Sequence, residues 1–112
     1  MKPRKMMPKI VPSKDPKRAL RFYRDFFSFL QDTDQNGNRI LIIDNGVIQF
    51  VKNDTPSNKI EILARDHFED IKKHLQNFFI DFRIEDDLKN ASKIYFVFKD
   101  TEDNLIYLQV NR

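Results

Sequence analysis

Apolar residues recur at helical spacing soon after the start of the chain. Tyr23 and Phe26 belong to a stripe that faces away from a run of Lys and Arg side chains. Asp15 and Pro16 stand directly before this stripe, at the positions where helices favour a capping carboxylate and a proline. The pattern predicts a helix over residues 16–27.

A second helical pattern begins in the middle of the chain. Its predicted buried stripe consists of Phe68, Ile71, Leu75 and Phe78. Asp66 precedes them as a candidate N-cap, and Glu69 follows three residues later, which matches a capping box. We therefore expect a second helix that is capped by Asp66 and packed through this stripe.

The remaining apolar segments are short and are separated by turn formers, as is typical of strands. Asn45-Gly46 joins two of them with a dipeptide that strongly favours a hairpin. A linker over residues 53–58 divides the chain, and each half shows the order strand, helix, strand, strand, strand. The predicted strands cover residues 8–13, 29–32, 39–44, 47–52, 59–65 and 79–84, followed by a hairpin over 94–111 whose two strands flank an acidic turn.

The composition is that of one folded domain, with 112 residues, 40% hydrophobic content and 11 Phe. We expect residues 1–7 to be a loose leader and residues 8–112 to be a single domain, with modules of about 8–53 and 58–112. The chain has no Cys, and no apolar segment approaches the ~20 residues that cross a bilayer. These features predict a cytoplasmic protein with no membrane partner.

Positive charge is concentrated near the start of the chain, although the net charge is only +3. The first 24 residues contain nine Lys and Arg but only one acid, Asp15. A basic segment of this kind can bind nucleic acid. No recognition motif accompanies it, and later acidic segments nearly balance it, so we interpret it as a solvated helix face and expect no nucleic-acid partner.

Two motifs carry a resemblance to a known family. IVPSKDPKRALRFYRDFFSF is similar to an opening strand and helix in which a Gly usually stands at the position of Ser28. KDTEDNLIYL is similar to an Asp-Pro-x-Gly-Asn turn and final strand; Asp100 and Asn104 are kept, whereas Thr101 and Asp103 replace Pro and Gly. Both resemble the glyoxalase/bleomycin-resistance/dioxygenase superfamily, the vicinal oxygen chelate proteins. The resemblance covers nearly all of the chain after the leader. It implies an α+β fold, in which two βαβββ modules form a curled mixed sheet around a cleft, and a homodimer.

The resemblance also implies positions for the ligands of a divalent metal. They fall on Pro8, Gln49, Lys59 and Tyr107. Proline has no donor atom, lysine repels a cation, and tyrosine ionises only near pH ~10. One amide oxygen does not hold a metal, so we expect neither a metal nor a cofactor. We interpret the two histidines as exposed side chains of the second helix.

A ligand-binding cleft is the remaining candidate site. Alternation along the last strand separates the Ile106 face from the Tyr107 face, and the resemblance assigns the Tyr107 face to the cleft. The lining would suit a neutral or cationic organic molecule. The alternative is that these side chains fill the cleft or lie at a dimer interface. The predicted lining consists of Gln49, Glu61, Tyr95, Val97, Tyr107 and Gln109.

The predicted function is therefore to bind an unidentified small organic molecule, by sequestration and as a homodimer. The opening strand most resembles the metal-free bleomycin-resistance type, although the basic charge argues against the same kind of drug. The alternative is a lyase, isomerase or dioxygenase that uses a divalent metal or an unrecognised acid/base site. Because the expected metal ligands are absent, the sequence favours a binding protein over an enzyme and indicates no catalytic residue.

Overall fold

The computed structural model describes residues 1–55 and 58–112, so part of the predicted linker, residues 56 and 57, lies outside the described residues. Its helices are α1 (Pro16–Phe27) and α2 (Phe68–Asn77). None of the helices within the described residues has the length and apolar character needed to cross a membrane. The strands are β1 (Pro3–Met7), β2 (Ile10–Ser13), β3 (Leu30–Thr33), β4 (Arg39–Ile43), β5 (Gly46–Lys52), β6 (Lys59–His67), β7 (Arg83–Asp86), β8 (Lys93–Lys99) and β9 (Leu105–Asn111).

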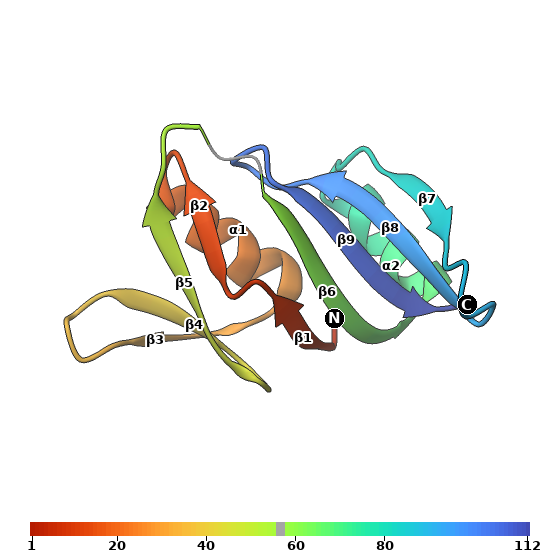
Figure 1. Ribbon diagram of the computed structural model, residues 1–112, viewed down its shortest axis with the longest axis horizontal. Helices are drawn as coiled ribbons and strands as arrows, with labels where there is room; N and C mark the ends of the chain where they lie inside the picture. The colour runs from red at the N-terminus through yellow and green to blue at the C-terminus, as the bar shows by residue number, and fades with distance from the viewer. Residues whose placement is uncertain (56–57) are drawn as a thin grey trace.

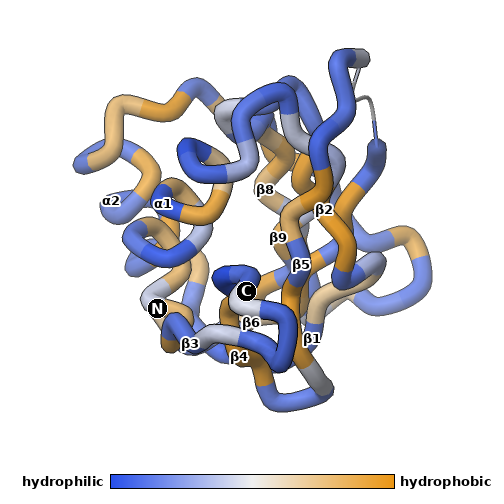
Figure 2. The backbone as a smooth tube through the Cα atoms, turned by 90° about the vertical axis from the view of Figure 1, so that its left-hand side faces the viewer, coloured by the Kyte–Doolittle hydropathy of each residue, from blue (hydrophilic) through white to orange (hydrophobic). Residues whose placement is uncertain are grey.

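The strands form two sheets that lie side by side, with both helices on the same side of them (Figures 1 and 2). One sheet has the order β1-β6-β9-β8-β7 and the other β2-β5-β4-β3. In each sheet one pair is parallel, β6 with β9 and β2 with β5, and the other pairs are antiparallel. The predicted α+β architecture of two βαβββ modules is confirmed, as β2-α1-β3-β4-β5 and β6-α2-β7-β8-β9.

The core lies between the helices and the faces of the sheets that they cover. In β9 the alternate residues Ile106, Leu108 and Val110 are all fully buried, as period-two alternation requires of one strand face. Tyr23 and Phe26 of α1 are also fully buried and belong to the same core. The opposite faces of both sheets are left open, and these faces are turned to the viewer in Figure 1.

The first seven residues differ from the expectation of a loose leader. Residues 3–7 form strand β1, which pairs antiparallel with β6 at the edge of the five-stranded sheet. Met6 is buried in the core, while the neighbouring Arg4 and Lys5 are exposed. A short basic segment with one inward side chain gives little local signal, because its order comes from a ladder with residues far along the chain.

The start of the second helix also differs from the prediction. Helix α2 begins at Phe68, and His67 takes the cap position without a side-chain hydrogen bond. Asp66 stays within β6, where its Oδ1 accepts a hydrogen bond of 2.6 Å from the backbone N–H of Lys2. The carboxylate that was expected to cap the helix therefore ties β1 to β6.

The seventh strand occupies residues 83–86 rather than 79–84. Phe79 adopts a left-handed conformation with φ 56°, and the N–H of Ile80 donates to the carbonyl of Leu75 at 3.0 Å. A hydrogen bond from an N–H to the carbonyl five residues earlier is a usual closure of a helix C-terminus. Residues 78–80 therefore complete the end of α2 and are not available for a strand.

Candidate functional site

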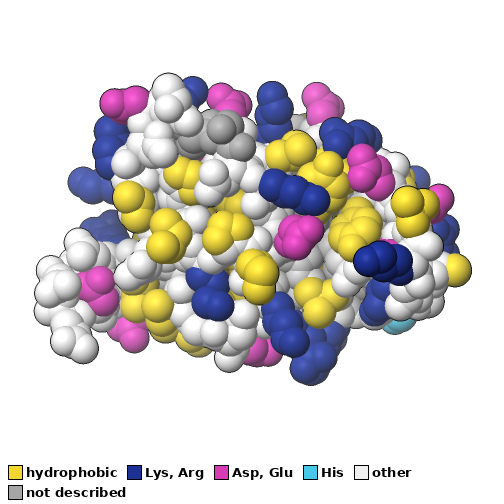
Figure 3. Space-filling model, in the orientation of Figure 1, with side chains coloured by type: hydrophobic (Ala, Val, Ile, Leu, Met, Phe, Trp, Pro, Cys, Tyr) yellow, Lys and Arg dark blue, Asp and Glu magenta, His cyan; other side chains and the backbone are white. Residues whose placement is uncertain are grey.

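A hollow of about 220 Å³ lies on the open face of the five-stranded sheet. Its sheet residues include Glu61, Tyr95, Tyr107 and Gln109, which are four of the six predicted cleft residues. Lys5 and Met7 of β1 and Asn45 of the β4–β5 turn contribute at its margin. On this face of the molecule hydrophobic side chains spread over both sheets and are interspersed with Lys and Arg (Figure 3).

Strand register explains why these four residues meet. Across β6, β9 and β8, Glu61 lies opposite Tyr107, and Tyr107 lies opposite Val97. One step further along, Gln109 lies opposite Tyr95. Directly paired residues on one face of a sheet have Cβ atoms roughly 4.5–5.5 Å apart, close enough for their side chains to touch. The structure thus brings these residues together, and their role in ligand binding stays a prediction.

Tyr95 and Gln109 form a small polar group with Asp87, a residue that sequence reasoning did not single out. Gln109 Nε2 donates to the hydroxyl oxygen of Tyr95 and to Oδ2 of Asp87, both at 3.0 Å. The Tyr95 hydroxyl lies 3.4 Å from the same carboxylate oxygen. Partial burial raises the pKa of Tyr95, and the neighbouring carboxylate raises it further. Tyr95 therefore remains a neutral hydroxyl at physiological pH.

Tyr107 is flanked by two cations. Lys59 Nζ lies 4.3 Å from the centroid of its ring, and Arg83 Nη2 donates to its hydroxyl at 3.2 Å. Lys59 also forms an ion pair of 3.5 Å with Glu61, and Arg83 one of 3.0 Å with Glu85. All four charged side chains are largely exposed, so these pairs contribute little to stability. They do place both signs of charge beside one aromatic ring.

The other two predicted cleft residues do not line this hollow. Val97 shares the face of Tyr107 but is buried, because it stands between Arg83 and Tyr107 in the strand register and their side chains join beside it. Gln49 lies on β5 of the other sheet, opposite Ile10 of β2. It is exposed and lines a separate cavity near α1.

Two of the four positions to which metal ligands were projected lie side by side. Tyr107 and Lys59 contact each other, so an ammonium group stands beside the tyrosine where a divalent cation would need anionic or neutral donors. Within residues 1–55 and 58–112 there is no group of three or more His, Cys, Asp and Glu placed to hold a metal. His74, expected to be exposed, is half-buried, and its Nε2 lies 2.6 Å from the carbonyl oxygen of Phe26.

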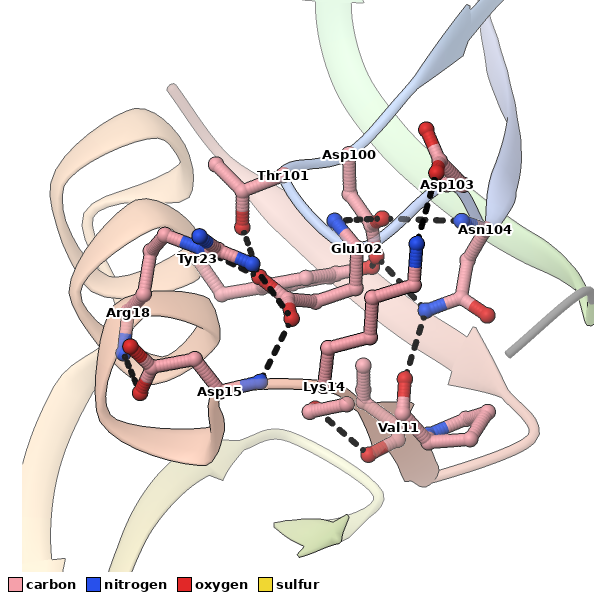
Figure 4. A network of polar contacts seen from close by, with 12 residues as sticks. Val11, Lys14, Asp15, Arg18, Tyr23, Asp100, Thr101, Glu102, Asp103 and Asn104 are labelled. Carbon is pink, nitrogen blue, oxygen red and sulfur yellow. Dashed lines mark hydrogen bonds and ion pairs between the residues drawn. The ribbon is translucent and has the colours of Figure 1, made fainter. Parts of the chain in front are cut away.

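The turn between β8 and β9 is held against the start of α1 by a buried carboxylate (Figure 4). Glu102 is 1% exposed, and its carboxylate accepts hydrogen bonds from Arg18 Nε at 2.8 Å and Nη2 at 3.1 Å. The backbone N–H of Asp15 and the hydroxyl of Thr101 also donate to it, at 2.8 and 2.7 Å. Burial alone would raise the pKa of Glu102, but these four bonds and the charge of Arg18 outweigh it and hold the pKa at about 2.

A second part of this turn network is centred on Asp100. Its Oδ2 accepts hydrogen bonds from the hydroxyl of Tyr23 at 2.6 Å and from Asn104 Nδ2 at 2.9 Å. Asn104 Nδ2 also donates to the carbonyl of Pro12 at 2.9 Å, which ties the turn to β2. Burial raises the pKa of Asp100 despite these bonds, and burial together with Asp100 raises the pKa of Tyr23. We call these contacts of Asp100, Glu102 and Asn104 the turn clamp.

Backbone conformations in the two motifs agree with the substitutions seen in the sequence. Asp103 has φ 70° and Ser28 has φ 60°, so each adopts the left-handed conformation that glycine favours. This agrees with the sequence motif, in which Asp103 stands at the position of a glycine and Asp100 and Asn104 are the residues kept in the turn. Sequence reasoning missed Glu102, because nothing in the local sequence links that residue to Arg18, 84 positions earlier.

Comparison with known proteins gives a clear result only at the level of structure. No protein-family model and no curated protein matches the chain. A lactoylglutathione lyase from Agrobacterium tumefaciens superposes with a TM-score of 0.74 at 12% identity, over 90% of this chain and 89% of that chain. A genomically encoded fosfomycin resistance protein from Listeria monocytogenes gives 0.71 at 10% identity, over 92% and 89%.

A third solved structure is described as a member of the glyoxalase/bleomycin resistance protein/dioxygenase superfamily, from Sphaerobacter thermophilus. It gives a TM-score of 0.68 at 17% identity, over 91% of this chain and 93% of that chain. At such identities the likeness establishes the fold and does not transfer an activity. The chain has the fold of the glyoxalase/bleomycin resistance/dioxygenase superfamily, and the resemblance that its two sequence motifs indicated is supported.

Proposed function

We propose that this protein binds a small organic molecule in the hollow between Tyr95 and Tyr107, without a metal. The observation that carries the proposal is the convergence of Glu61, Tyr95, Tyr107 and Gln109 on one open sheet face. Ligand sites typically combine apolar or aromatic walls with a few convergent polar groups. Here the two rings lie 6.2 Å apart at 73°, with an amide and a carboxylate beside them.

The contacts around Tyr107 refine the expected charge of the ligand. The sequence suggested a neutral or cationic molecule, with Glu61 as the attracting group. In the structure Lys59 already pairs with Glu61 and covers one side of the Tyr107 ring. A cationic ligand would have to displace Lys59, whereas a neutral polar molecule can bind to Tyr95 and Gln109 without breaking this pair. We therefore favour a neutral ligand that is flat enough to stack on an aromatic ring.

We further propose that the protein acts as a homodimer in which the open sheet faces are covered by a second copy. Met7 and Ile10 are 67% and 50% exposed, and Val47 and Val51 of β5 are 41% and 49% exposed. Exposed apolar side chains gathered on one face favour an interface. A second copy would also enlarge a hollow of 220 Å³, which is small for an organic ligand on its own.

The proposal is tested on the purified full chain by thermal-shift screening against neutral aromatic and heteroaromatic compounds, followed by calorimetric titration of each hit. We expect saturable binding. Gln109→Ala should weaken it about tenfold, because the ligand loses the hydrogen bonds that the Gln109 amide would make to it. Glu69→Ala, an exposed change on α2, is the matched control and should leave the affinity unchanged. The same sample is analysed for bound metal and, by sedimentation, for its oligomeric state. Stoichiometric tightly bound metal, or hits that bind the Gln109 variant equally well, would overturn the proposal.

A further inference from the structure

A larger cavity, of about 600 Å³, lies on the helix side of the four-stranded sheet. It forms where the sheet opens: β4 pairs with β5 only from Leu41 to Ile43, and beyond Leu41 the β3–β4 hairpin projects away from the body (Figure 1). The cavity is bounded by the first turns of α1, the hairpin turn and the second half of β5. It is separate from the hollow that contains Tyr107, since the two share no residue.

Two of the side chains that line this cavity, Arg39 and Phe50, can be placed by strand alternation. Leu41 and Ile48 are fully buried and pair with each other, so their strand face is the one packed on α1. Arg39 lies two residues from Leu41, and Phe50 two residues from Ile48, so both lie on that same face. Phe50 contacts the ring of Tyr23 in α1 with centroids 5.6 Å apart, which confirms this direction.

The cavity joins an apolar floor to a cationic rim. Leu20 and Phe50 contribute apolar surface, and Lys17, Arg39 and Lys52 contribute positive charge. Within the described parts of the chain, no ion pair engages Lys17 or Arg39.

The charges already present at the rim are partly balanced. Lys52 Nζ donates to the carbonyl of Lys14 at 2.6 Å and pairs with exposed Asp54 at 3.1 Å. Asp34 is the one acid that lines the cavity among the described residues, and its Oδ1 accepts from the backbone N–H groups of Asn36 and Asn38 at 2.9 Å. With Asp34 counted, Lys17 and Arg39 leave an excess of one positive charge at the rim for a ligand.

We propose that this cavity binds an amphipathic anion, a small molecule that combines a carboxylate with an apolar body. The carboxylate would pair with Arg39 and Lys17 at the rim, and the apolar body would lie on Leu20 and Phe50. The volume falls within the range of roughly 300–1,000 Å³ that is usual for small-molecule sites. Arg39 and Lys17 are both exposed at the rim, and an arginine fork together with a lysine is well suited to hold a carboxylate there.

Octanoate is the probe for this proposal, and octylammonium, with the same chain and the opposite charge, is its comparator. Both are titrated into the full chain by calorimetry and by amide NMR. We expect saturable octanoate binding with shifts at Lys17, Leu20, Arg39 and Phe50, and at least tenfold weaker binding of octylammonium. Arg39→Gln and Lys17→Gln each remove one charge-assisted hydrogen bond to the carboxylate, so each should weaken octanoate binding by about fivefold to tenfold.

Two further variants separate this site from the rest of the surface. Arg21→Gln removes an exposed cation of α1 that does not line the cavity, and Gln109→Ala alters the other hollow; both should bind octanoate as the wild type does. Thermal melts establish that each variant is folded, which is expected because these side chains are exposed or half-buried. Equal binding of octylammonium, equal loss in Arg21→Gln, absence of octanoate binding, or shifts confined to the Tyr107 hollow would overturn the proposal.

Discussion

The hairpin of β8 and β9 carries two polar networks of opposite character. At its turn, the clamp buries Asp100, Glu102 and Asn104, and each of these side chains is hydrogen-bonded. Along its strands, Tyr95, Tyr107 and Gln109 are half-buried and face a hollow. A buried polar group must be satisfied by the protein itself, whereas a half-exposed one can exchange its partner for a ligand. The same hairpin thus serves stability at one end and offers contacts at the other.

The clamp also joins the two modules. Arg18 and Tyr23 of α1 belong to the first module, while Glu102 and Asp100 belong to the second. These side-chain bonds act together with the β1–β6 ladder to position one module against the other. Weakening the clamp should therefore affect the whole fold, and changing the hollow should not.

The largest expected effect comes from breaking the clamp with Glu102→Ala. The change removes four hydrogen bonds and leaves the backbone N–H of Asp15 without its partner. We expect a loss of about 3 kcal/mol in the free energy of unfolding. The loss is no larger because Arg18 is half-exposed and can turn to water when its partner is removed. Urea denaturation measures it. A loss below about 1 kcal/mol, the range of a surface pair, would show that the clamp is no different from an exposed contact.

The pH dependence of stability tests the contribution of Glu102 in a second way. The pKa of Glu102 is about 2 in the folded protein, below its ordinary value of 4.5, so its ionised form stabilises the fold above pH 4.5 and this contribution is lost as the pH falls toward 2. Asp100 acts in the opposite direction, because burial raises its pKa and its ionisation costs stability as the pH rises through that value.

The test compares the wild type with Glu102→Gln, which keeps the size of the side chain and removes its charge. The difference in free energy of unfolding should be greatest near pH 7 and should shrink between pH 4.5 and 2. Urea titrations at five or six pH values would follow it. A difference that stays constant over this range would mean that the ionised carboxylate does not stabilise the fold.

The smallest effect is expected at Ser28, which ends α1 in a left-handed conformation with φ 60° and ψ 35°. Ser28→Gly should stabilise the protein by about 0.5 kcal/mol, because glycine has no Cβ penalty there but loses more chain entropy on folding. Ser28→Ala is the matched control and should give no gain. Thermal melts of both variants would measure the change in stability. Equal stabilisation by alanine would show that the left-handed backbone conformation is not the cause of the gain.

Much of the fold could be predicted from the sequence because its signals are local. The Asp15-Pro16 start, the Asn45-Gly46 turn and the alternation of β9 each specify their elements within a few residues. The misplaced elements depend on distant partners. β1 is ordered by pairing with β6, and Asp66 bonds to Lys2 rather than capping α2.

The site could be predicted only where it follows from strand register. Alternation and the family resemblance together placed Glu61, Tyr95, Tyr107 and Gln109 on one face. They did not reveal Arg83, which bonds to Tyr107 from β7, because that contact depends on how β7 pairs with β8 and leaves no local signal in the sequence. Nor did they separate Gln49, since its place depends on how the two sheets lie relative to each other.

The most direct measurement compares two neighbours in β9, Tyr107→Ala and Ile106→Ala, for unfolding free energy and for affinity toward a ligand found by screening. Ile106 is fully buried on the helix side, and its loss should cost about 3 kcal/mol. Tyr107 lies on the open face, so its loss should cost less than about 1 kcal/mol but weaken binding at least tenfold. A large stability loss in Tyr107→Ala with unchanged affinity would contradict the division of the two faces.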